Sequence, residues 1–262
     1  MNILVTICAR AGSKGVKSKN IRDFLGAPIC YYTLSAYALF LRRYGEEYGD
    51  FTLAVNTDAP ALFAQLDRTG LDYLRVPRKA SLAGDSASKI DVIRDTLREA
   101  QRRTKRTYDA VIDMDLTSPL RRAVDIRNVL DALLANPEAE IALSVTEARR
   151  NPYFNQLAVR PSGFLGTAIE SDFVARQQAP QVFDANASLY AYRPDVLLNA
   201  HTILIKAKLV PSVMPDTAVL DIDSERDYEL LGVVAQYFFD SDPAYGEVRD
   251  AIPQLFKDVH AN

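Results

Sequence analysis

The sequence has few of the residues that build disulfide frameworks and metal centres, and it has no long apolar run. Only two cysteines occur among its 262 residues, Cys8 and Cys30, and their spacing fits neither a CxxC motif nor a zinc site. No stretch approaches the roughly 18 apolar residues of a membrane span, and the first residues do not resemble a secretory signal. We therefore expect a cytoplasmic protein that does not enter a membrane, with a buried, inert thiol at Cys8.

A surplus of basic residues is also missing. The net charge is −3, whereas general nucleic-acid binders usually carry a basic surplus, so we expect no nucleic-acid partner. Neither His201 nor His260 stands in a context that suggests a catalytic base. Hydrophobic residues make up 48% of the chain and charged residues 25%, as is ordinary for globular proteins. We expect residues 1–262 to form a single domain.

Short apolar runs alternate with amphipathic stretches through the first half of the chain. The runs predict buried strands at 2–8, 51–58, 73–78, 108–116 and 140–148. The stretches between them carry apolar residues at helical spacing and predict helices at 27–43, 59–69, 89–104 and 123–135. This alternation is typical of an α/β fold with a mostly parallel sheet and helices on both faces.

The pattern changes after residue 150. A β-hairpin with its turn at Pro161-Ser162-Gly163 is predicted at 156–169, as part of a small β excursion at about 150–187 rather than of the main sheet. The last helix is predicted to start near Asp223 or Ser224, which would cap it. The other predicted elements are a strand at 188–194, a short helix at 196–200, an extended segment at 209–215 and this last helix at 223–239.

The stretch CARAGSKGVKSKN connects the first predicted strand to the first helix. A loop in that place presents backbone N–H groups at the carboxyl edge of the sheet, where ligands bind in open α/β folds. Gly12 and Gly15 allow positive φ and close approach of the backbone. The loop predicts a site for an anion with several oxygens, such as a triphosphate, because its cationic residues include Arg10, Lys14 and Lys19. The alternative is a solvated turn, and the spelling fits neither a P-loop nor GxGxxG.

Two carboxylates alternate in the stretch DIDSERD, which precedes the last long helix. Asp221 and Asp223 can face one side of an extended segment. Neighbouring carboxylates repel each other unless a cation lies between them, and hard Mg²⁺ with phosphate oxygens suits such a pair. The stretch therefore predicts a magnesium site, and the alternative is a helix N-cap.

Residues 115–121, DLTSPLR, follow a strongly apolar predicted strand. Thr117 and Ser118 can form hydrogen bonds to a ligand, and Arg121 can pair with a carboxylate. The alternative is a strand-to-helix turn in which a threonine or serine caps the helix.

Taken in order, these motifs resemble the acylneuraminate cytidylyltransferases, the family of the CMP-sialic acid and CMP-nonulosonic acid synthetases. The resemblance covers residues 1 to about 235 and rests on ARAGSKGVKSKNI, NTD, GDSASKIDV, TSPLR, RQQAPQVFDANASLY and DIDSERDYEL. It implies a Rossmann-like nucleotidyltransferase fold and a homodimer held together by the excursion. It also implies a reaction in which CTP and a nonulosonic acid give a CMP-sugar and pyrophosphate, as the anomeric hydroxyl attacks the α-phosphorus.

The resemblance further implies roles for individual residues. The catalytic residues would be Arg10, Lys19 and Asp223. The ligands of Mg²⁺ would be Asp221 and Asp223. The nucleotide would be bound by Ala9, Arg10, Gly12, Ser13, Lys14, Lys19, Asn20, Arg78, Ser86 and Ser88. The sugar would be bound by Asp115, Thr117, Ser118, Arg121, Arg176, Gln177 and Asn186.

Departures from the family pattern fall on the sugar side. Asp115 replaces the glutamine of the sialate enzymes' QPTSPLR, and an ionised carboxylate can only accept hydrogen bonds, for example from amide N–H groups. Tyr153 and Phe154 stand where those enzymes often place a lysine, and this aromatic pair suits a methyl group better than a hydroxyl. Within the sialic, legionaminic and pseudaminic types of nonulosonic acid, we therefore expect one of the less polar, N-acylated types.

Two other functions remain open from the sequence. One is a cytidylyltransferase for the eight-carbon acid Kdo or another sugar nucleotidyltransferase, although the Kdo enzymes' loop resembles ARxxSxRxPGKP and this loop does not. The other is a non-catalytic nucleotide-binding relative. The intact Arg10, Lys19, Asp221 and Asp223 argue against the second.

Overall fold

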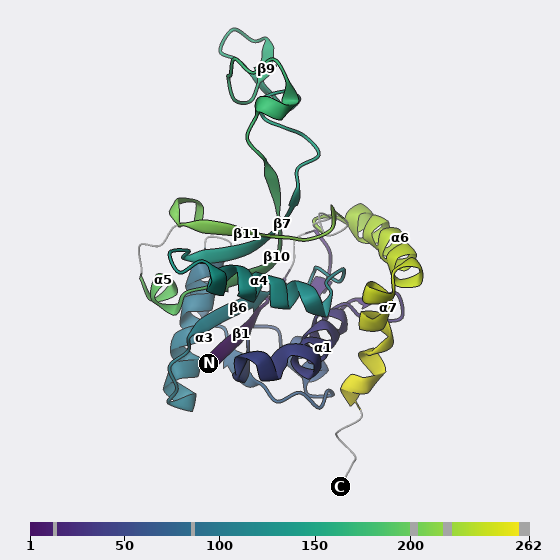
Figure 1. Cartoon of the computed structure of the whole chain (residues 1–262). Coiled ribbons are helices and arrows are strands. Elements are labelled where there is room, and N and C mark those ends of the chain that lie inside the picture. Colours follow the sequence, from purple (N-terminus) through teal and green to yellow (C-terminus); the bar gives the residue numbers. More distant parts are fainter. Residues whose placement is uncertain (13–14, 85–86, 200–203, 217–221, 257–262) are drawn as a thin grey trace.

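A seven-stranded sheet forms the centre of the computed structural model, which describes residues 1–12, 15–84, 87–199, 204–216 and 222–256 (Figure 1). Its strands are β1 (Asn2–Cys8), β4 (Asp50–Thr57), β5 (Leu74–Pro77), β6 (Ala110–Met114), β7 (Ile141–Glu147), β10 (Phe183–Tyr192) and β11 (Leu209–Val213). They lie in the order β11-β7-β10-β6-β1-β4-β5. Within this sheet β10 runs antiparallel to β6 and β7, and every other neighbouring pair is parallel, so the prediction of a mostly parallel sheet is confirmed.

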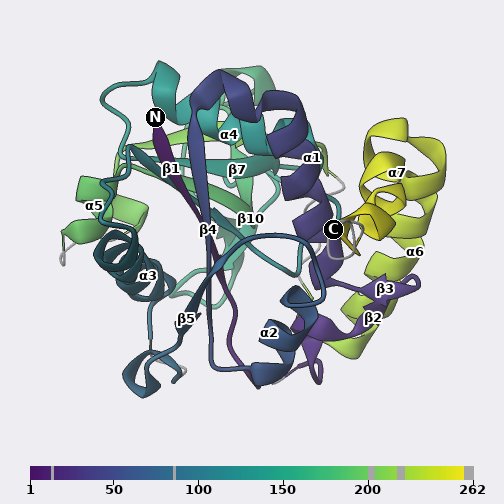
Figure 2. The same ribbon diagram turned by 90° about the horizontal axis from the view of Figure 1, so that it is seen from below.

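Helices cover both faces of the sheet, as predicted. Figure 2 shows α1 and α4 on one side and α3 and α5 on the other, while α6 and α7 pack beside α1. The helices are α1 (Cys30–Tyr48), α2 (Pro60–Leu66), α3 (Lys89–Thr104), α4 (Ala123–Ala135), α5 (Pro194–Leu198), α6 (Glu225–Ser241) and α7 (Pro243–Asp250). None of the helices within the described ranges is long and apolar enough to cross a membrane.

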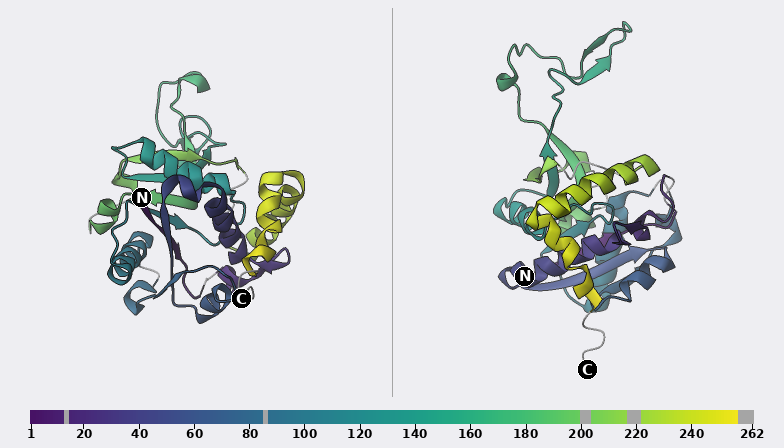
Figure 3. Two further views of the ribbon diagram at one scale, coloured as in Figure 1. Left: turned by 60° about the horizontal axis from the view of Figure 1, so that its bottom comes forward. Right: turned by 90° about the vertical axis from the view of Figure 1, so that its right-hand side faces the viewer.

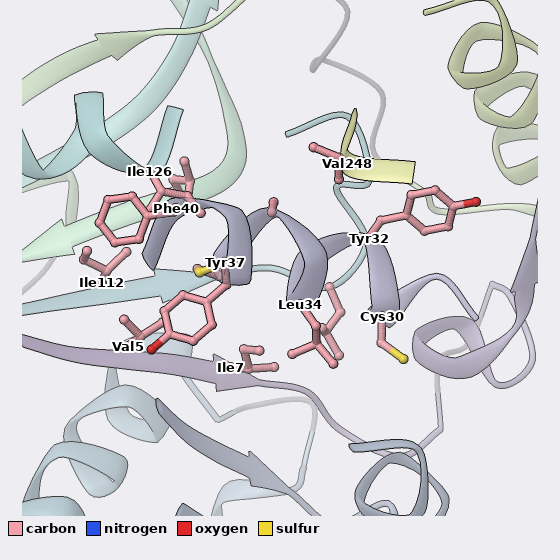
Figure 4. Packing of buried hydrophobic residues seen from close by; sticks show 14 of the residues in the cluster. Val5, Ile7, Cys30, Tyr32, Leu34, Tyr37, Phe40, Ile112, Ile126 and Val248 are labelled. Carbon is pink, nitrogen blue, oxygen red and sulfur yellow. The ribbon is translucent and has the colours of Figure 1, made fainter. Parts of the chain in front are cut away.

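Strand β1 is buried on both faces, which explains its continuous apolar sequence. Val5 and Ile7 face α1, where Leu34 and Tyr37 point toward them (Figure 4). Leu4, between them in the alternation, belongs to the second core under α3 and α5. The next two side chains on the α3 face are those of Thr6 and Cys8. Cys8 stands at the end of the strand, next to the site described below.

The strand and helix predictions are confirmed most closely where the apolar period is strongest, at 2–8, 89–104 and 123–135. The helix predicted at 27–43 instead begins at Cys30, because Pro28 lies in a two-strand ribbon formed by β2 (Asp23–Phe24) and β3 (Ala27–Pro28). It continues to Tyr48, whose ring is buried and whose hydroxyl donates to Asp131 Oδ1 at 2.6 Å. Tertiary packing therefore extends α1 past the predicted end.

The predicted excursion projects from the edge of the body near β7 and β10 (Figures 1 and 3). Its hairpin pairs β8 (Leu157–Val159) with β9 (Leu165–Thr167) in antiparallel fashion, which confirms the predicted turn between them. The return strand β10 begins at Phe183, earlier than the predicted residue 188, because its first residues already pair with β7. The register shifts between Ala185 and Tyr190, so the strand is irregular at that point.

Truncation of Leu34 to alanine tests the core beneath α1. Leu34 is fully buried, so Leu34→Ala is expected to lower the free energy of unfolding by about 2–5 kcal/mol. The matched control is Leu230→Ala on α6, where the side chain is 49% exposed and the expected change is below about 0.5 kcal/mol. Urea denaturation measures both, and equal losses in the two variants would contradict the assigned core.

Candidate active site

The basic loop after β1 lies at the carboxyl edge of the sheet, where the sequence predicts it. The backbone N–H of Ala11 donates to Asp58 Oδ1 at 2.6 Å, which ties the loop to the residue that follows β4. Gly12 has a φ of 76°, a conformation that favours glycine. The neighbouring Ser13 and Lys14 lie outside the described residues.

The second part of the loop packs against the acidic segment that leads into α6. Lys19 Nζ donates to the carbonyl oxygen of Ile222 at 2.7 Å. Gly15 lies so close to Asp223 that a Cβ atom on it would be 1.8 Å from the Asp223 carbonyl oxygen. Only glycine permits this approach, which brings the two predicted phosphate and metal motifs together. Asp221 lies outside the described residues.

A cavity of about 340 Å³ opens between these segments. Its lining includes Asp115 and Thr117 from the stretch after β6, opposite the loop and Asp223. A larger cavity of about 580 Å³ shares several loop residues with it and reaches the start of α2. The residues common to both are Arg10, Gly15, Lys19 and Asn20. All three predicted motifs therefore meet around two adjacent cavities, where Asp223 lies beside the basic loop and Asp115 comes from the stretch after β6.

Two residues of the expected nucleotide set hold neighbouring backbone in place. Asn20 Nδ2 donates to the carbonyl oxygen of Arg10 at 3.2 Å, so its amide shapes the loop from within. Arg78 donates to Asn56 at the end of β4, from Nε to Oδ1 at 3.0 Å and from Nη2 to the carbonyl oxygen at 3.2 Å. Burial lowers the pKa of Arg78 from its ordinary value.

At the start of α6, the helix is capped by residues other than the predicted acidic pair. Ser224 is the N-cap, and its Oγ accepts from the Asp227 N–H at 3.2 Å. Asp227 Oδ2 in turn accepts from the Asp223 N–H at 3.2 Å and from Ser224 Oγ at 2.8 Å. Capping, the alternative for this stretch, is thus carried out by Ser224 and Asp227, and Asp223 borders the cavity.

Asp115 is held by three donors at the cavity wall. Its Oδ1 accepts from the Thr117 N–H at 2.9 Å and from Thr117 Oγ1 at 2.7 Å, and Lys89 Nζ lies 3.2 Å from Oδ2. Burial alone would raise the pKa of Asp115, but the Lys89 charge and the Thr117 hydrogen bonds outweigh it and hold the pKa well below its usual range. Asp115 is therefore an ionised acceptor in a fixed orientation.

Lys89 and Asp113 form an ion-pair network with Asp115, and the sequence reasoning missed both. Lys89 Nζ lies 2.9 Å from Oδ2 of Asp113, whose side chain is fully buried and whose Oδ1 accepts from Thr6 Oγ1 at 2.7 Å. Burial would lower the pKa of Lys89, but Asp113 and Asp115 raise it well above its ordinary value. The available signal was an aspartate inside the apolar strand YDAVIDMDL, since such a charge needs a buried cation.

Cys8, expected to be a buried, inert thiol, is half-buried and lines the smaller cavity. Its Sγ lies 3.8 Å from Thr96 Oγ1. Burial and the nearby Asp113 carboxylate raise the pKa of the Cys8 thiol, which keeps it protonated and supports the prediction of an unreactive cysteine.

Arg121, expected at the sugar, is instead completely buried. Its guanidinium donates from Nε to Ser188 Oγ at 3.0 Å and from Nη1 to Thr33 Oγ1 at 3.1 Å. Nη2 donates to the carbonyl oxygens of Asp115 at 2.8 Å and Ser188 at 2.7 Å. Burial lowers the pKa of Arg121 to about 10. Arg121 therefore joins α1, β10 and the chain after β6. Its bond to the Asp115 carbonyl oxygen fixes the backbone of Asp115.

Asn186, also expected at the sugar, is likewise buried, and its side chain bonds to neighbouring strand residues. Its Oδ1 accepts from Ser144 Oγ at 2.5 Å and from the Ser188 N–H at 3.2 Å. These bonds compensate for the interrupted ladder at the irregular part of β10. The motif that carries Asn186 thus shapes the strand behind the site.

The remaining predicted residues fall in different places. Ser88 caps α3, since its Oγ accepts a backbone N–H of the first turn. Ser118 is half-buried beside the cavity-lining Thr117, and Gln177 is exposed on the excursion. Ser86 and the side chain of Arg176 lie outside the described residues.

Comparison with known proteins decides the family. The model of the family described as Cytidylyltransferase matches residues 4–207. The chain belongs to the cytidylyltransferase family. It is 34% identical to the CMP-N,N'-diacetyllegionaminic acid synthase of Campylobacter jejuni over 87% of this chain and 93% of that protein. It is 23% identical to the N-acylneuraminate cytidylyltransferase of Streptococcus agalactiae over 92% of this chain and 54% of that protein.

Solved structures agree on the fold of this cytidylyltransferase. A CMP:2-keto-3-deoxy-manno-octonic acid synthetase, solved with CTP, matches with a TM-score of 0.62 and 16% identity over 90% of this chain and 99% of that one. Likeness at this identity shows the fold alone. The predicted nucleotidyltransferase fold is therefore confirmed.

Substitution of Gly15 tests the packing of the cytidylyltransferase loop against the Asp223 segment. Gly15→Ala is expected to weaken CTP binding by about tenfold or more, because the loop must move away from Asp223 to admit a methyl group. Isothermal titration calorimetry with CTP measures this.

Gly232→Ala is the matched control for Gly15→Ala. Gly232 lies within α6, and a Cβ there meets no atom within 4 Å, so CTP affinity is expected to stay unchanged. Alanine also favours a helix by up to about 1 kcal/mol relative to glycine. Unchanged CTP affinity in Gly15→Ala would contradict the proposed contact.

Proposed function

We propose that this cytidylyltransferase activates a nonulosonic acid with CTP, giving the CMP-sugar and pyrophosphate. The observation that carries the proposal is the convergence of the basic loop, Asp223 and Asp115 around one cavity. Nucleotidyl transfer needs positioning and neutralisation of charge more than covalent help from the protein. A cavity lined by both cations and carboxylates meets that need, since it can neutralise phosphates and hold a metal ion.

On the nucleotide side, the loop binds the triphosphate in this proposal. Arg10 and Lys19 line both cavities and would neutralise the phosphates, including the charge that develops on the leaving pyrophosphate. The sugar acid would then lie on the Asp115 side, with its anomeric hydroxyl directed at the α-phosphorus.

Mg²⁺ is the cofactor in this proposal, and the described residues fit it. No three His, Cys, Asp or Glu side chains cluster as a metal site within the described part of the chain. Mg²⁺, however, usually takes only one or two carboxylates and fills its remaining positions with water and substrate phosphates. Asp223 at the cavity suits this role, with Asp221 as its partner. The bound ion would neutralise phosphate oxygens and acidify the attacking hydroxyl.

On the sugar side, we propose an N-acylated acid of the legionaminic type. Asp115 supports this choice because an ionised carboxylate accepts hydrogen bonds from the N–H groups of such substituents. The 34% identity to a diacetyllegionaminic acid synthase, compared with 23% to an N-acylneuraminate enzyme, favours the same choice. Both cysteines are free thiols, which supports a cytoplasmic location for the reaction.

We also propose a homodimer in which the excursion contacts the partner subunit. The excursion exposes large apolar side chains, among them Phe164 at 77% and Val174 at 90% exposure. Exposed apolar patches of this kind mark interaction surfaces. Gln177 lies in a short helical turn of the same excursion and is exposed, so we propose that it serves the partner's sugar site.

Pyrophosphate release tests the reaction directly. The assay combines the protein with CTP, Mg²⁺ and, in turn, N-acetylneuraminic, N,N'-diacetyllegionaminic, pseudaminic and Kdo acids. Turnover is expected with the legionaminic acid above the others. Asp223→Asn is expected to lower turnover by about three orders of magnitude or more. Mg²⁺ would lose a carboxylate ligand, and with the ion the reacting phosphates would lose their electrostatic stabilisation.

The control for Asp223→Asn is Asp227→Asn, which alters the cap of α6 but keeps the carboxylate at the cavity. It is expected to lower stability by about 1 kcal/mol with turnover within severalfold of the wild type. Near-normal turnover in Asp223→Asn would contradict the metal assignment. Turnover with Kdo alone, or with none of the four acids, would contradict the proposed substrate.

Phe164→Asp tests the excursion as a dimer contact. Phe164 is exposed in the single chain, so the substitution is expected to leave the fold intact and convert dimers to monomers. Light scattering coupled to gel filtration measures the mass. Tyr237→Asp on α6, where the side chain is 66% exposed, is the control and should remain dimeric. A wild-type monomer, or a dimer unchanged by Phe164→Asp, would overturn this proposal.

A further inference from the structure

Lys89 places one positive charge between two carboxylates of unequal exposure. Asp113 is fully buried, whereas the side chain of Asp115 is 31% exposed and lines the smaller cavity. The ammonium group lies 2.9 Å from the first carboxylate and 3.2 Å from the second. Lys89 therefore links a residue within the sheet to a residue at the cavity wall.

The buried end of this link is enclosed within the sheet. Asp113 is in the middle of the sheet, on a strand flanked by β1 and β10, and its other carboxylate oxygen accepts from Thr6 Oγ1 at 2.7 Å. The Tyr190 ring, opposite Asp113 in the register of β10, lies 5.3 Å from Lys89 Nζ and flanks the ammonium group. Ser88 caps the helix that Lys89 begins, which holds the backbone of Lys89 as well.

The exposed end of the link is held in one orientation. Thr117 donates twice to Oδ1 of Asp115, and Lys89 approaches Oδ2. A carboxylate has about four acceptor positions, so three donors leave Asp115 able to accept one more hydrogen bond from the cavity. Two carboxylates already balance the Lys89 charge, which makes Lys89 poorly suited to bind phosphate itself.

We propose that Lys89, anchored by Asp113, is a positioning residue that orients the Asp115 carboxylate to accept a hydrogen bond from an N–H or O–H donor of the acceptor sugar acid. This proposal deepens the proposed function and rests on it. Lys89 acts through Asp115 and need not touch the substrate. Its contribution should therefore appear in the use of the sugar acid and not in the use of CTP.

A double-mutant cycle in an Asp113→Asn background tests the proposal. Removing Lys89 alone would leave Asp113 buried without a cation, which endangers the fold. With Asp113→Asn, Asp115 is the carboxylate that remains beside Lys89. The cycle compares four proteins, all of which carry Asp113→Asn. One has no further change, one adds Lys89→Met, one adds Asp115→Asn, and one adds both substitutions. Circular dichroism and thermal unfolding establish that each variant is folded.

The kinetic readout is pyrophosphate release with CTP, Mg²⁺ and N,N'-diacetyllegionaminic acid. In the Asp113→Asn background, Lys89→Met is expected to lower kcat/KM for the sugar acid about tenfold, mainly through KM. The KM for CTP should stay within about twofold. Once Asp115→Asn is present, Lys89→Met should change kcat/KM for the sugar acid by less than about twofold, because no oriented carboxylate is left to lose.

Three results would overturn the proposal. An equal loss from Lys89→Met with and without Asp115→Asn would mean that Lys89 acts independently of Asp115. A rise in the KM for CTP would mean that Lys89 serves the nucleotide. No loss in either background would leave Lys89 with a purely structural role. Absence of turnover by the wild-type protein is a separate result, and it would overturn the proposed function together with this proposal.

Discussion

The close approach of Gly15 to the backbone of Asp223 is the constraint on which the rest of the site depends. The loop after the first strand and the segment before α6 are far apart in the sequence, and this contact joins them. The bond from Lys19 to the Ile222 carbonyl oxygen reinforces it. Without it, the cationic and acidic motifs would not line the same cavity side by side. The seven-stranded sheet supplies the carboxyl edge from which the loop after β1 extends.

Charged side chains are also buried next to the site, and each has hydrogen-bond or ion-pair partners. Arg121 directs its guanidinium to two hydroxyls and two carbonyl oxygens, and Lys89 lies between two carboxylates. Removing such groups from water is costly unless they are paired and hydrogen-bonded. The result is a fixed orientation of Asp115. Lys89, the first residue of α3, contacts its carboxylate, and Arg121 donates to its backbone carbonyl oxygen. A flexible carboxylate would discriminate poorly between donors of different substrates.

Much of this architecture could be predicted from the sequence, for identifiable reasons. The apolar run at 2–8 and the amphipathic period at 89–104 determine their elements locally, and the motif order is sufficient to indicate the family. The start of α1 was missed because the ribbon around Pro28 replaces its first turn. Its end was missed because the contact of Tyr48 with Asp131 is tertiary.

The site residues, too, could be predicted only as far as local sequence determines them. A motif indicates which backbone segment reaches the site, but it does not indicate which side chains of that segment face the cavity. Arg121 and Asn186 stand in the expected segments and are nevertheless buried behind them. Lys89 and Asp113 were missed because their pairing crosses from a helix to the strand beneath it. The packing of α3 on the sheet brings the two side chains together, and the local sequence around either residue does not encode that packing.

The central claim is that the nucleotide binds between the basic loop and Asp223. The most direct measurement is a crystal structure of the protein with CTP and Mg²⁺. We expect the triphosphate beside Arg10 and Lys19, with a metal ion at Asp223 and open space left beside Asp115 for the sugar acid. A nucleotide bound elsewhere, for example in the cavity between α1 and α7 that Arg42 and Arg249 line, would contradict it.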